Sequence, residues 1–174
     1  MRAAYDYGAD AVYAGSPRYS LRARNNEFAK LDVLEQGIKE AHERNKKFFL
    51  TVNTLPHNSK LKTFVSDMEP LIAMKPDALI MADPGLIMTV REKWPGMPIH
   101  LSVQANTTNY WGVKFWQNIG VERIILSREL SMEEIAEIRQ ECPDIELEVF
   151  IHGALCIAYS GRCLLSGYFN HRDP

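Results

Sequence analysis

Short apolar segments alternate along the chain with longer amphipathic ones. The short segments are apolar at consecutive positions, which is typical of strands buried on both faces of a parallel sheet. The pattern predicts six strands, at residues 9–15, 48–52, 78–81, 99–103, 123–126 and 147–151.

The longer segments carry apolar residues at helical spacing, so each predicts a helix between two strands. Met1–Gly8 predicts the end of a helix that Gly8 terminates. Asp83 predicts an N-cap and Ser131-x-x-Glu134 a capping box. Pro70 predicts a kink or restart, because proline disrupts a helix interior. The apolar helix positions are Leu31, Leu34, Ile38 and Ala41; Leu61, Phe64, Val65, Met68, Leu71 and Ile72; Trp111, Phe115, Trp116 and Ile119; and Ile135 and Ile138.

This alternation predicts an α/β fold of parallel β/α repeats. A closed eight-repeat barrel needs about 250 residues, and the chain has 174. We therefore expect an incomplete TIM-like barrel, a fragment that could also settle as an open parallel sheet. Without a linker or low-complexity segment, residues 1–174 predict a single β/α domain, truncated at both ends relative to a whole barrel.

Polar residues directly follow several predicted strands. Parallel α/β sheets bind ligands outside the carboxyl ends of their strands, and a polar residue beside a buried strand needs a partner or a ligand. Asn53, Gln104 and Arg128 are therefore candidate catalytic residues. His152 is a candidate general acid or base, although a histidine that only hydrogen-bonds its loop fits the pattern equally well.

A basic loop follows the first predicted strand. Phosphates and bases are bound by arginine, lysine and aromatic side chains, and arginine also binds carboxylates. Arg24 and Arg128 could serve a small acid instead of RNA. A solvated charged face is the alternative reading, because the formal net charge of −2 gives no overall attraction to nucleic acid. The candidate RNA-binding or substrate-binding residues are Arg18, Tyr19, Arg22, Arg24, Asn26, Lys60 and Lys62.

Cys156 and Cys163 lie in a glycine-rich stretch after the last predicted strand. Their spacing is too wide for a Cys-x-x-Cys motif, and two thiolates do not complete a metal site. Two buried cysteines that act as small apolar residues are the alternative. Cys142, before Pro143, is predicted to be structural. The chain has no run of about 18 apolar residues and no signal-peptide pattern, so we expect a cytoplasmic protein without membrane contact.

The same stretch carries a sequence signature, and further similarity extends upstream through residues 8–15, 19–28, 77–85, 100–106 and 126–130. The chain resembles the family catalogued as U32 peptidases, also called collagenase-like proteases. Within that family it is most similar to the bacterial prephenate-dependent tRNA uridine hydroxylases. The signature positions are Glu148, Phe150, Gly153, Ala154, Leu155, Cys156, Gly161, Cys163, Leu165 and Ser166.

The resemblance implies an enzyme that converts the wobble uridine of tRNA to 5-hydroxyuridine with a prephenate-derived donor. It also implies that Cys156 and Cys163 are two of four ligands to a 4Fe-4S iron–sulfur cluster, the other two lying beyond this chain, so that the fragment alone is inactive. Peptidase activity is the alternative, although the chain has neither Gly-x-Ser-x-Gly nor His-Glu-x-x-His.

Overall fold

The protein is described from a computed structural model, which covers residues 1–21, 23, 26–153, 158–160, 162–163 and 168–169. The chain divides into two compact units, Met1–Met97 (unit 1) and Pro98–Pro174 (unit 2). The division does not test the expected single truncated domain, which stays a prediction.

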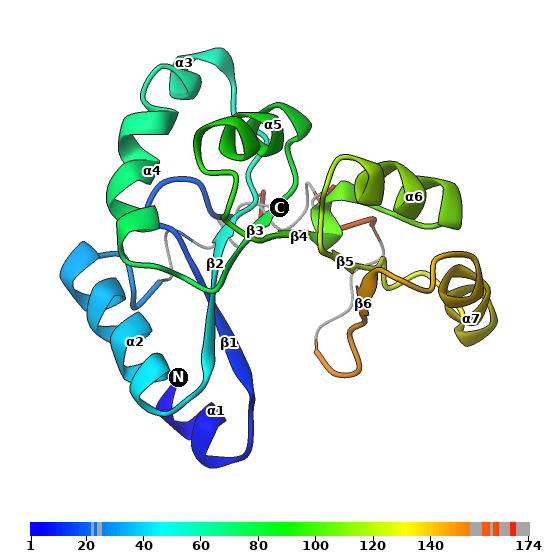
Figure 1. Cartoon of the computed structure of the whole chain (residues 1–174), viewed down its shortest axis with the longest axis horizontal. Coiled ribbons are helices and arrows are strands. Elements are labelled where there is room, and N and C mark those ends of the chain that lie inside the picture. Colours follow the sequence, from blue (N-terminus) through cyan, green and yellow to red (C-terminus); the bar gives the residue numbers. More distant parts are fainter. Residues whose placement is uncertain (22, 24–25, 154–157, 161, 164–167, 170–174) are drawn as a thin grey trace. The chain divides into compact units, whose positions relative to one another are not determined.

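Unit 1 contains three parallel strands that are neighbours in chain order. Ala11 of the first strand faces Lys47 of the second, and Phe49 of the second faces Ala78 of the third. Helices α2 and α4 lie side by side along these strands (Figure 1). The elements are α1 (Arg2–Asp6), β1 (Ala11–Gly15), α2 (Leu31–Glu43), β2 (Lys47–Val52), α3 (Asn58–Leu61), α4 (Phe64–Ala73), β3 (Ala78–Met81) and α5 (Pro84–Lys93).

The core of unit 1 follows the predicted periodicity. Leu34, Ile38 and Ala41 of α2 are buried on the helix face that packs on β2, and most of the other side of the helix is polar. Leu31, which the sequence groups with them, is 46% exposed. Residues of β2 and β3 are buried at almost every position, as in a parallel sheet that is covered on both faces. The buried strands therefore fix where their carboxyl ends, and the polar loops that follow, are placed.

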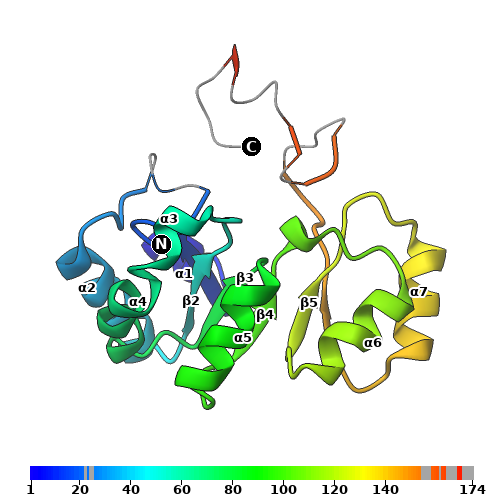
Figure 2. The same ribbon diagram turned by 90° about the horizontal axis from the view of Figure 1, so that it is seen from above.

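Unit 2 repeats this architecture with shorter strands. His100 faces Arg123 across the first strand pair, and Arg123 faces Glu146 across the second, both pairs being parallel. Helices α6 and α7 lie side by side (Figure 2). The elements are β4 (Ile99–Leu101), a 3₁₀ helix (Val103–Ala105), α6 (Tyr110–Asn118), β5 (Arg123–Ile125), α7 (Met132–Glu141) and β6 (Glu146–Glu148).

The predicted helix starts are confirmed. The Asp83 side chain accepts a hydrogen bond from the Leu86 amide at the start of α5. Ser131 and Glu134 form the reciprocal capping box of α7, each side chain bonding the other residue's amide. Such caps are local in sequence, which is why the sequence alone predicts them.

Several predicted boundaries are wrong. β1 begins at Ala11 rather than residue 9, and β4 ends at Leu101 because Val103 enters the 3₁₀ helix. The helical break before α4 falls between Leu61 and Phe64, whereas Pro70 lies inside α4. The last strand is Glu146–Glu148, and residues 149–151 lie outside it and are exposed. An apolar run does not distinguish a strand from the extended segment that follows it.

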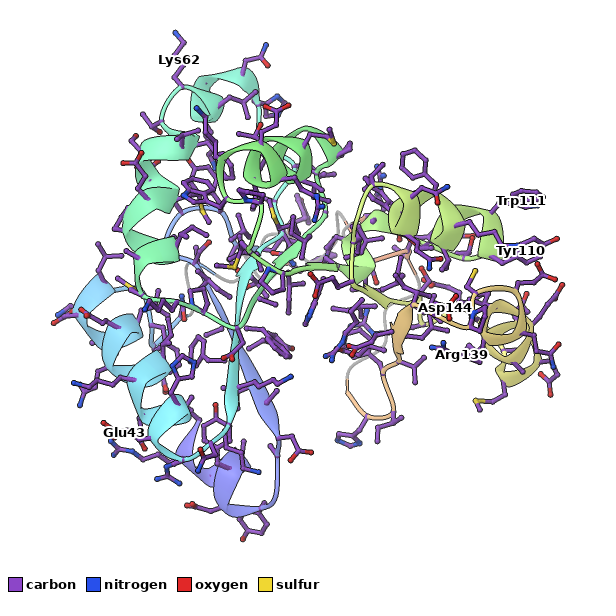
Figure 3. The ribbon with its side chains drawn as sticks, viewed as in Figure 1. Glu43, Lys62, Tyr110, Trp111, Arg139 and Asp144 are labelled. Carbon is purple, nitrogen blue, oxygen red and sulfur yellow. The ribbon has the colours of Figure 1, made fainter. Side chains whose placement is uncertain are left out.

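The residues predicted to form the apolar face of α6 are not the ones that the helix buries. Val113 is the buried residue of the helix, whereas 70% of Trp111 and 55% of Phe115 are exposed. Tyr110 and Trp111 project from the outer end of α6 (Figure 3). Lys114 lies over both rings, with its ammonium 5.1 Å from the Tyr110 ring centroid and 5.5 Å from that of Trp111. Helical spacing predicts which residues share a face, but not what covers that face.

The predicted fold class is confirmed. Six parallel strands alternate with helices in the described residues, fewer than the eight strands of a closed barrel. None of the helices in this part of the chain is long and apolar enough to span a bilayer.

Candidate functional site

The loop after β1 is tied to the end of β2 by buried hydrogen bonds. The Ser16 amide donates to the carbonyl of Thr51 at 2.9 Å, and the Ser20 and Thr51 hydroxyl oxygens lie 3.1 Å apart. The loop passes so close to β1 that a Cβ on Gly15 would lie 2.6 Å from the Ser20 Oγ. Only glycine fits this position without displacing the loop.

Asn53 is one of the anchors of this loop. Its side-chain oxygen accepts a hydrogen bond from the Leu21 amide at 3.3 Å, and the Thr54 amide donates to the Tyr19 carbonyl at 3.1 Å. Asn26 closes the loop by donating to the Gly15 carbonyl. The structure therefore gives Asn53 and Asn26, both predicted site residues, an observed part in shaping the loop.

Tyr19 joins the loop to helix α4. Its side chain is 1% exposed and its ring packs edge to face on Phe64, with 5.1 Å between the centroids. Its hydroxyl donates to Asp67 at 2.7 Å. Burial, followed by the Asp67 carboxylate, raises the pKa of the tyrosine. A base cannot stack on a ring in this position, so the predicted stacking role is not supported.

Asp67 also binds Arg18. The guanidinium lies 2.8 Å from the carboxylate and is mostly exposed. Burial disfavours the Asp67 charge, but hydrogen bonds from Tyr19 and Thr63, together with Arg18, outweigh it and lower the pKa of the carboxyl. Asp67 is thus a charged link that orients Arg18 at the surface.

Tyr19, the neighbour of Arg18, also contacts helix α3, and exposed lysine side chains lie in this helix and directly after it. The Tyr19 hydroxyl lies 3.2 Å from the carbonyl oxygen of Lys60, so the loop and α3 are in contact. Lys60 and Lys62 are exposed, and Lys62 projects outward just beyond α3 (Figure 3). The structure thus brings three predicted RNA-binding cations, Arg18, Lys60 and Lys62, to one region of unit 1. Arg22 and Arg24 lie outside the described residues.

Unit 2 holds the remaining predicted site residues. Gln104 is half-buried and lies in the 3₁₀ helix after β4. Its backbone carbonyl accepts a hydrogen bond from the side-chain amide of Asn106 at 3.0 Å. Asn106 adopts a left-handed conformation with φ 51°. The chain thus turns sharply after β4, and Gln104 lies in the 3₁₀ helix rather than directly after a strand, where the sequence predicts it.

Buried oxygen atoms gather near the ends of β4 and β5. The Ser127 amide donates to the Thr107 carbonyl at 3.3 Å, so the two loops touch. The Ser127 and Thr107 hydroxyls and the Asn106 side-chain oxygen are buried without a hydrogen-bond partner in the described part of the chain. Such groups usually bind water, a ligand or another protein segment. The sequence pattern placed this edge at the site but did not single out Thr107.

The Arg128 side chain makes two contacts with residues that follow β6. It donates to the Ser160 hydroxyl at 2.9 Å, and its guanidinium carbon lies 4.0 Å from the centroid of the Phe150 ring. His152, after β6, is exposed. Sequence reasoning missed Ser160, which carries no local signal of its contact with a residue 32 positions away.

One of the two signature cysteines, Cys163, lies in the described part of the chain. Cys163 is half-buried, and Cys156 lies outside the described residues. Cys142 is 2% exposed, and burial raises the pKa of its thiol, as its predicted structural role requires. No group of three or more histidine, cysteine or acidic residues suited to a metal occurs in the described ranges.

A surface groove beside β6 contains none of the predicted catalytic, substrate-binding or metal-binding residues. Most of its charged side chains are paired: Arg123 binds Glu146 and Glu148, and Arg139 donates to the carbonyls of Cys142 and Pro143. The groove therefore offers little unpaired charge to a ligand.

Comparison with known proteins is consistent with the sequence signature. The family model described as "Peptidase family U32" matches residues 1–174. The chain is 69% identical over 174 residues to "tRNA hydroxylation protein P" of Haemophilus influenzae and 67% identical to the protein of the same name in Escherichia coli. All of this chain is aligned in both cases, but it spans only 38% of each relative.

A solved structure supports the fold. "The Structure of the U32 Peptidase Mk0906" superposes with a TM-score of 0.67, covering 82% of this chain and 60% of that one. The sequence identity is 16%, so this similarity is evidence for a shared fold only and does not bear on activity.

Proposed function

Because the chain belongs to peptidase family U32 along its whole length, we propose that it is part of an enzyme that hydroxylates tRNA. The observation that supports this best is the 69% identity to a tRNA hydroxylation protein over every residue of the chain. Following the resemblance, the reaction converts the wobble uridine to 5-hydroxyuridine. The chain spans only 38% of the two relatives named above, so the activity belongs to the whole protein, which we place in the cytoplasm with its substrate.

The tRNA backbone binds the cationic region of unit 1 in this proposal. Arg18, Lys60 and Lys62 are exposed, and Arg18 is held in a fixed orientation by Asp67. Cations that neutralise phosphates give an affinity that falls as salt rises. The formal charge of −2 for the chain makes such a local cluster necessary for binding.

A paired substitution tests this surface. Lys60→Ala with Lys62→Ala weakens tRNA binding and reduces the slope of log affinity against log salt by about 0.7 to 0.9 for each phosphate that is no longer neutralised. Lys39→Ala with Lys93→Ala removes two other exposed lysines of unit 1 as a charge-matched control. An equal decrease of affinity in both double variants would place the RNA surface elsewhere.

The cysteine pair holds an iron–sulfur cluster in the whole protein. Thiolates are the usual ligands of such clusters, which need about four, so two come from outside this chain. The half-buried Cys163 fits a ligand better than the enclosed Cys142 does. A bound cluster supplies one-electron redox chemistry.

The hydroxyl donor is derived from prephenate. Its carboxylates suit arginine, whose planar guanidinium binds them with two hydrogen bonds. Arg128 is already in contact with Phe150 and Ser160, so we assign the donor to Arg24. Asn53, Gln104 and His152 remain candidate catalytic residues.

Purified full-length protein tests the function. Prepared without oxygen, it forms 5-hydroxyuridine in unmodified tRNA only when prephenate is present, as nucleoside mass spectrometry measures. Cys156→Ala and Cys163→Ala lower iron content and product together, while Cys142→Ala, the control, retains both. Cleavage of collagen peptides without any change in tRNA would instead establish the peptidase alternative.

A further inference from the structure

Arg128 contacts both ends of the segment that follows β6. Its Nη1 donates to the Ser160 hydroxyl at 2.9 Å, and its guanidinium lies on the Phe150 ring with 4.0 Å between the guanidinium carbon and the centroid. Phe150 comes shortly after the end of β6 at Glu148, and Ser160 lies three residues before Cys163. One side chain therefore contacts two residues that lie on opposite sides of Cys156 in the sequence.

Burial supports a specific contact at the far end of this segment. Ser160 is 9% exposed, whereas its neighbour Tyr159 is 58% exposed. The Arg162 amide donates to the Tyr159 carbonyl at 3.0 Å. Ser160 and Cys163 therefore lie on either side of a residue, Arg162, that is itself hydrogen-bonded to the neighbour of Ser160.

The backbone around Arg128 is itself held by hydrogen bonds. Arg128 follows β5 (Arg123–Ile125) by three residues. The Leu126 amide donates to the Glu148 carbonyl at 2.9 Å, which joins the end of β5 to the end of β6. The Ser127 amide bonds the Thr107 carbonyl. The backbone that carries Arg128 is therefore held on both sides.

We propose that Arg128 is a positioning residue: its contacts with Phe150 and Ser160 hold these two residues, and Cys163 close to Ser160 in the sequence, at the carboxyl ends of β5 and β6. Arg128 affects the reaction through these contacts, which we call the clamp. This rests on the proposed function only for its effect on turnover. The contacts of Arg128 with Phe150 and Ser160 do not depend on the substrate, because all three residues belong to this chain.

The chemistry of the contact requires arginine. A guanidinium is planar, so it can lie on an aromatic ring and donate a hydrogen bond from its edge at the same time. A lysine ammonium is a compact charge on a flexible stem and cannot hold both partners in this geometry. Arg128→Lys therefore keeps the charge and removes the clamp.

Hydrogen–deuterium exchange of the full-length protein tests the clamp directly. In Arg128→Lys and in Ser160→Ala, amides of residues 149–153, 158–160 and 162–163 exchange about fivefold faster, as expected when one hydrogen bond of typical strength is removed. The double variant exchanges no faster than the single variants, because both changes remove the same contact. Glu129→Gln, which alters the exposed neighbour of Arg128, leaves exchange unchanged. Unchanged exchange in Arg128→Lys would overturn the proposal even if hydroxylation is never observed.

Kinetics distinguish positioning from substrate contact. Both single variants lower kcat about fivefold, as expected if turnover needs the clamped state, with KM for tRNA and for prephenate within about twofold of the wild type. Ser160→Thr, which keeps the hydroxyl, restores kcat. A raised KM in Arg128→Lys with normal kinetics in Ser160→Ala would show that Arg128 binds substrate, and the positioning role would be wrong.

Discussion

Tyr19 combines a ring in the core of unit 1 with a hydroxyl that reaches Asp67, and it thereby links the loop after β1 to helix α4. The sequence predicts Tyr19 as part of a basic, base-stacking set, because aromatic and cationic residues occur together there. Burial is a long-range property that this local pattern cannot reveal. Its neighbour Arg18 stays exposed, so two adjacent residues of the same predicted set have different structural roles.

Removing the Tyr19 hydroxyl tests this link. Tyr19→Phe keeps the ring but removes the hydrogen bond to a charged carboxylate, so the free energy of unfolding falls by about 1–2 kcal/mol. Urea denaturation measures the decrease. Tyr7→Phe is the matched control, because Tyr7 is 94% exposed and its change is expected to be neutral. Equal stability of the two variants would show that the hydroxyl contributes nothing.

The Asp67 carboxyl gives the link a pH dependence of known sign. Its pKa is lowered in the folded state because hydrogen bonds and Arg18 outweigh the cost of burial. A carboxyl with a lowered folded pKa stabilises the protein above its unfolded pKa of about 3.9 and loses that contribution as pH falls through the folded value. Asp67→Asn is therefore less stable than the wild type at pH 7, and the difference shrinks below about pH 4. A difference that stays constant with pH would contradict this assignment.

Elements whose ends depend on local chemistry are the ones that the sequence predicts well. The caps at Asp83 and Ser131 are found as expected, because each involves atoms three residues apart. Apolar runs are less informative: the run after β6 is not strand, and Trp111 and Phe115 of α6 are exposed. In these cases the outcome depends on which distant segment covers the residues, and local periodicity carries no information about that.

The end of β1 is an element boundary that depends on one missing side chain. Gly15→Ala would place a Cβ 2.6 Å from the Ser20 hydroxyl, and that serine is held by Thr51. We expect a decrease of about 1–3 kcal/mol in unfolding free energy from the forced shift, together with weaker tRNA binding as Arg18 moves. Gly96→Ala is the control, since nothing lies within 4 Å of its added Cβ. A Gly15→Ala variant as stable as the control would mean that the loop adapts without cost.

At the scale of the whole molecule, parallel β/α repeats could be predicted because buried strands and amphipathic helices each have a distinct period. The candidate site could be predicted only as the carboxyl edge of the strands. The contacts that define it, such as Arg128 with Ser160 and Tyr19 with Asp67, join residues 32 and 48 positions apart. Pairings of this kind depend on the fold and leave no periodic trace in the sequence.

The central claim is that the full-length protein hydroxylates tRNA, and the most direct measurement is the 5-hydroxyuridine content of tRNA from bacteria that lack their own hydroxylases. Nucleoside mass spectrometry of cells that express the full-length protein is expected to detect 5-hydroxyuridine, and Cys163→Ala is expected to reduce it at equal protein level. Absence of 5-hydroxyuridine in cells that contain the folded, iron-loaded protein would contradict the account.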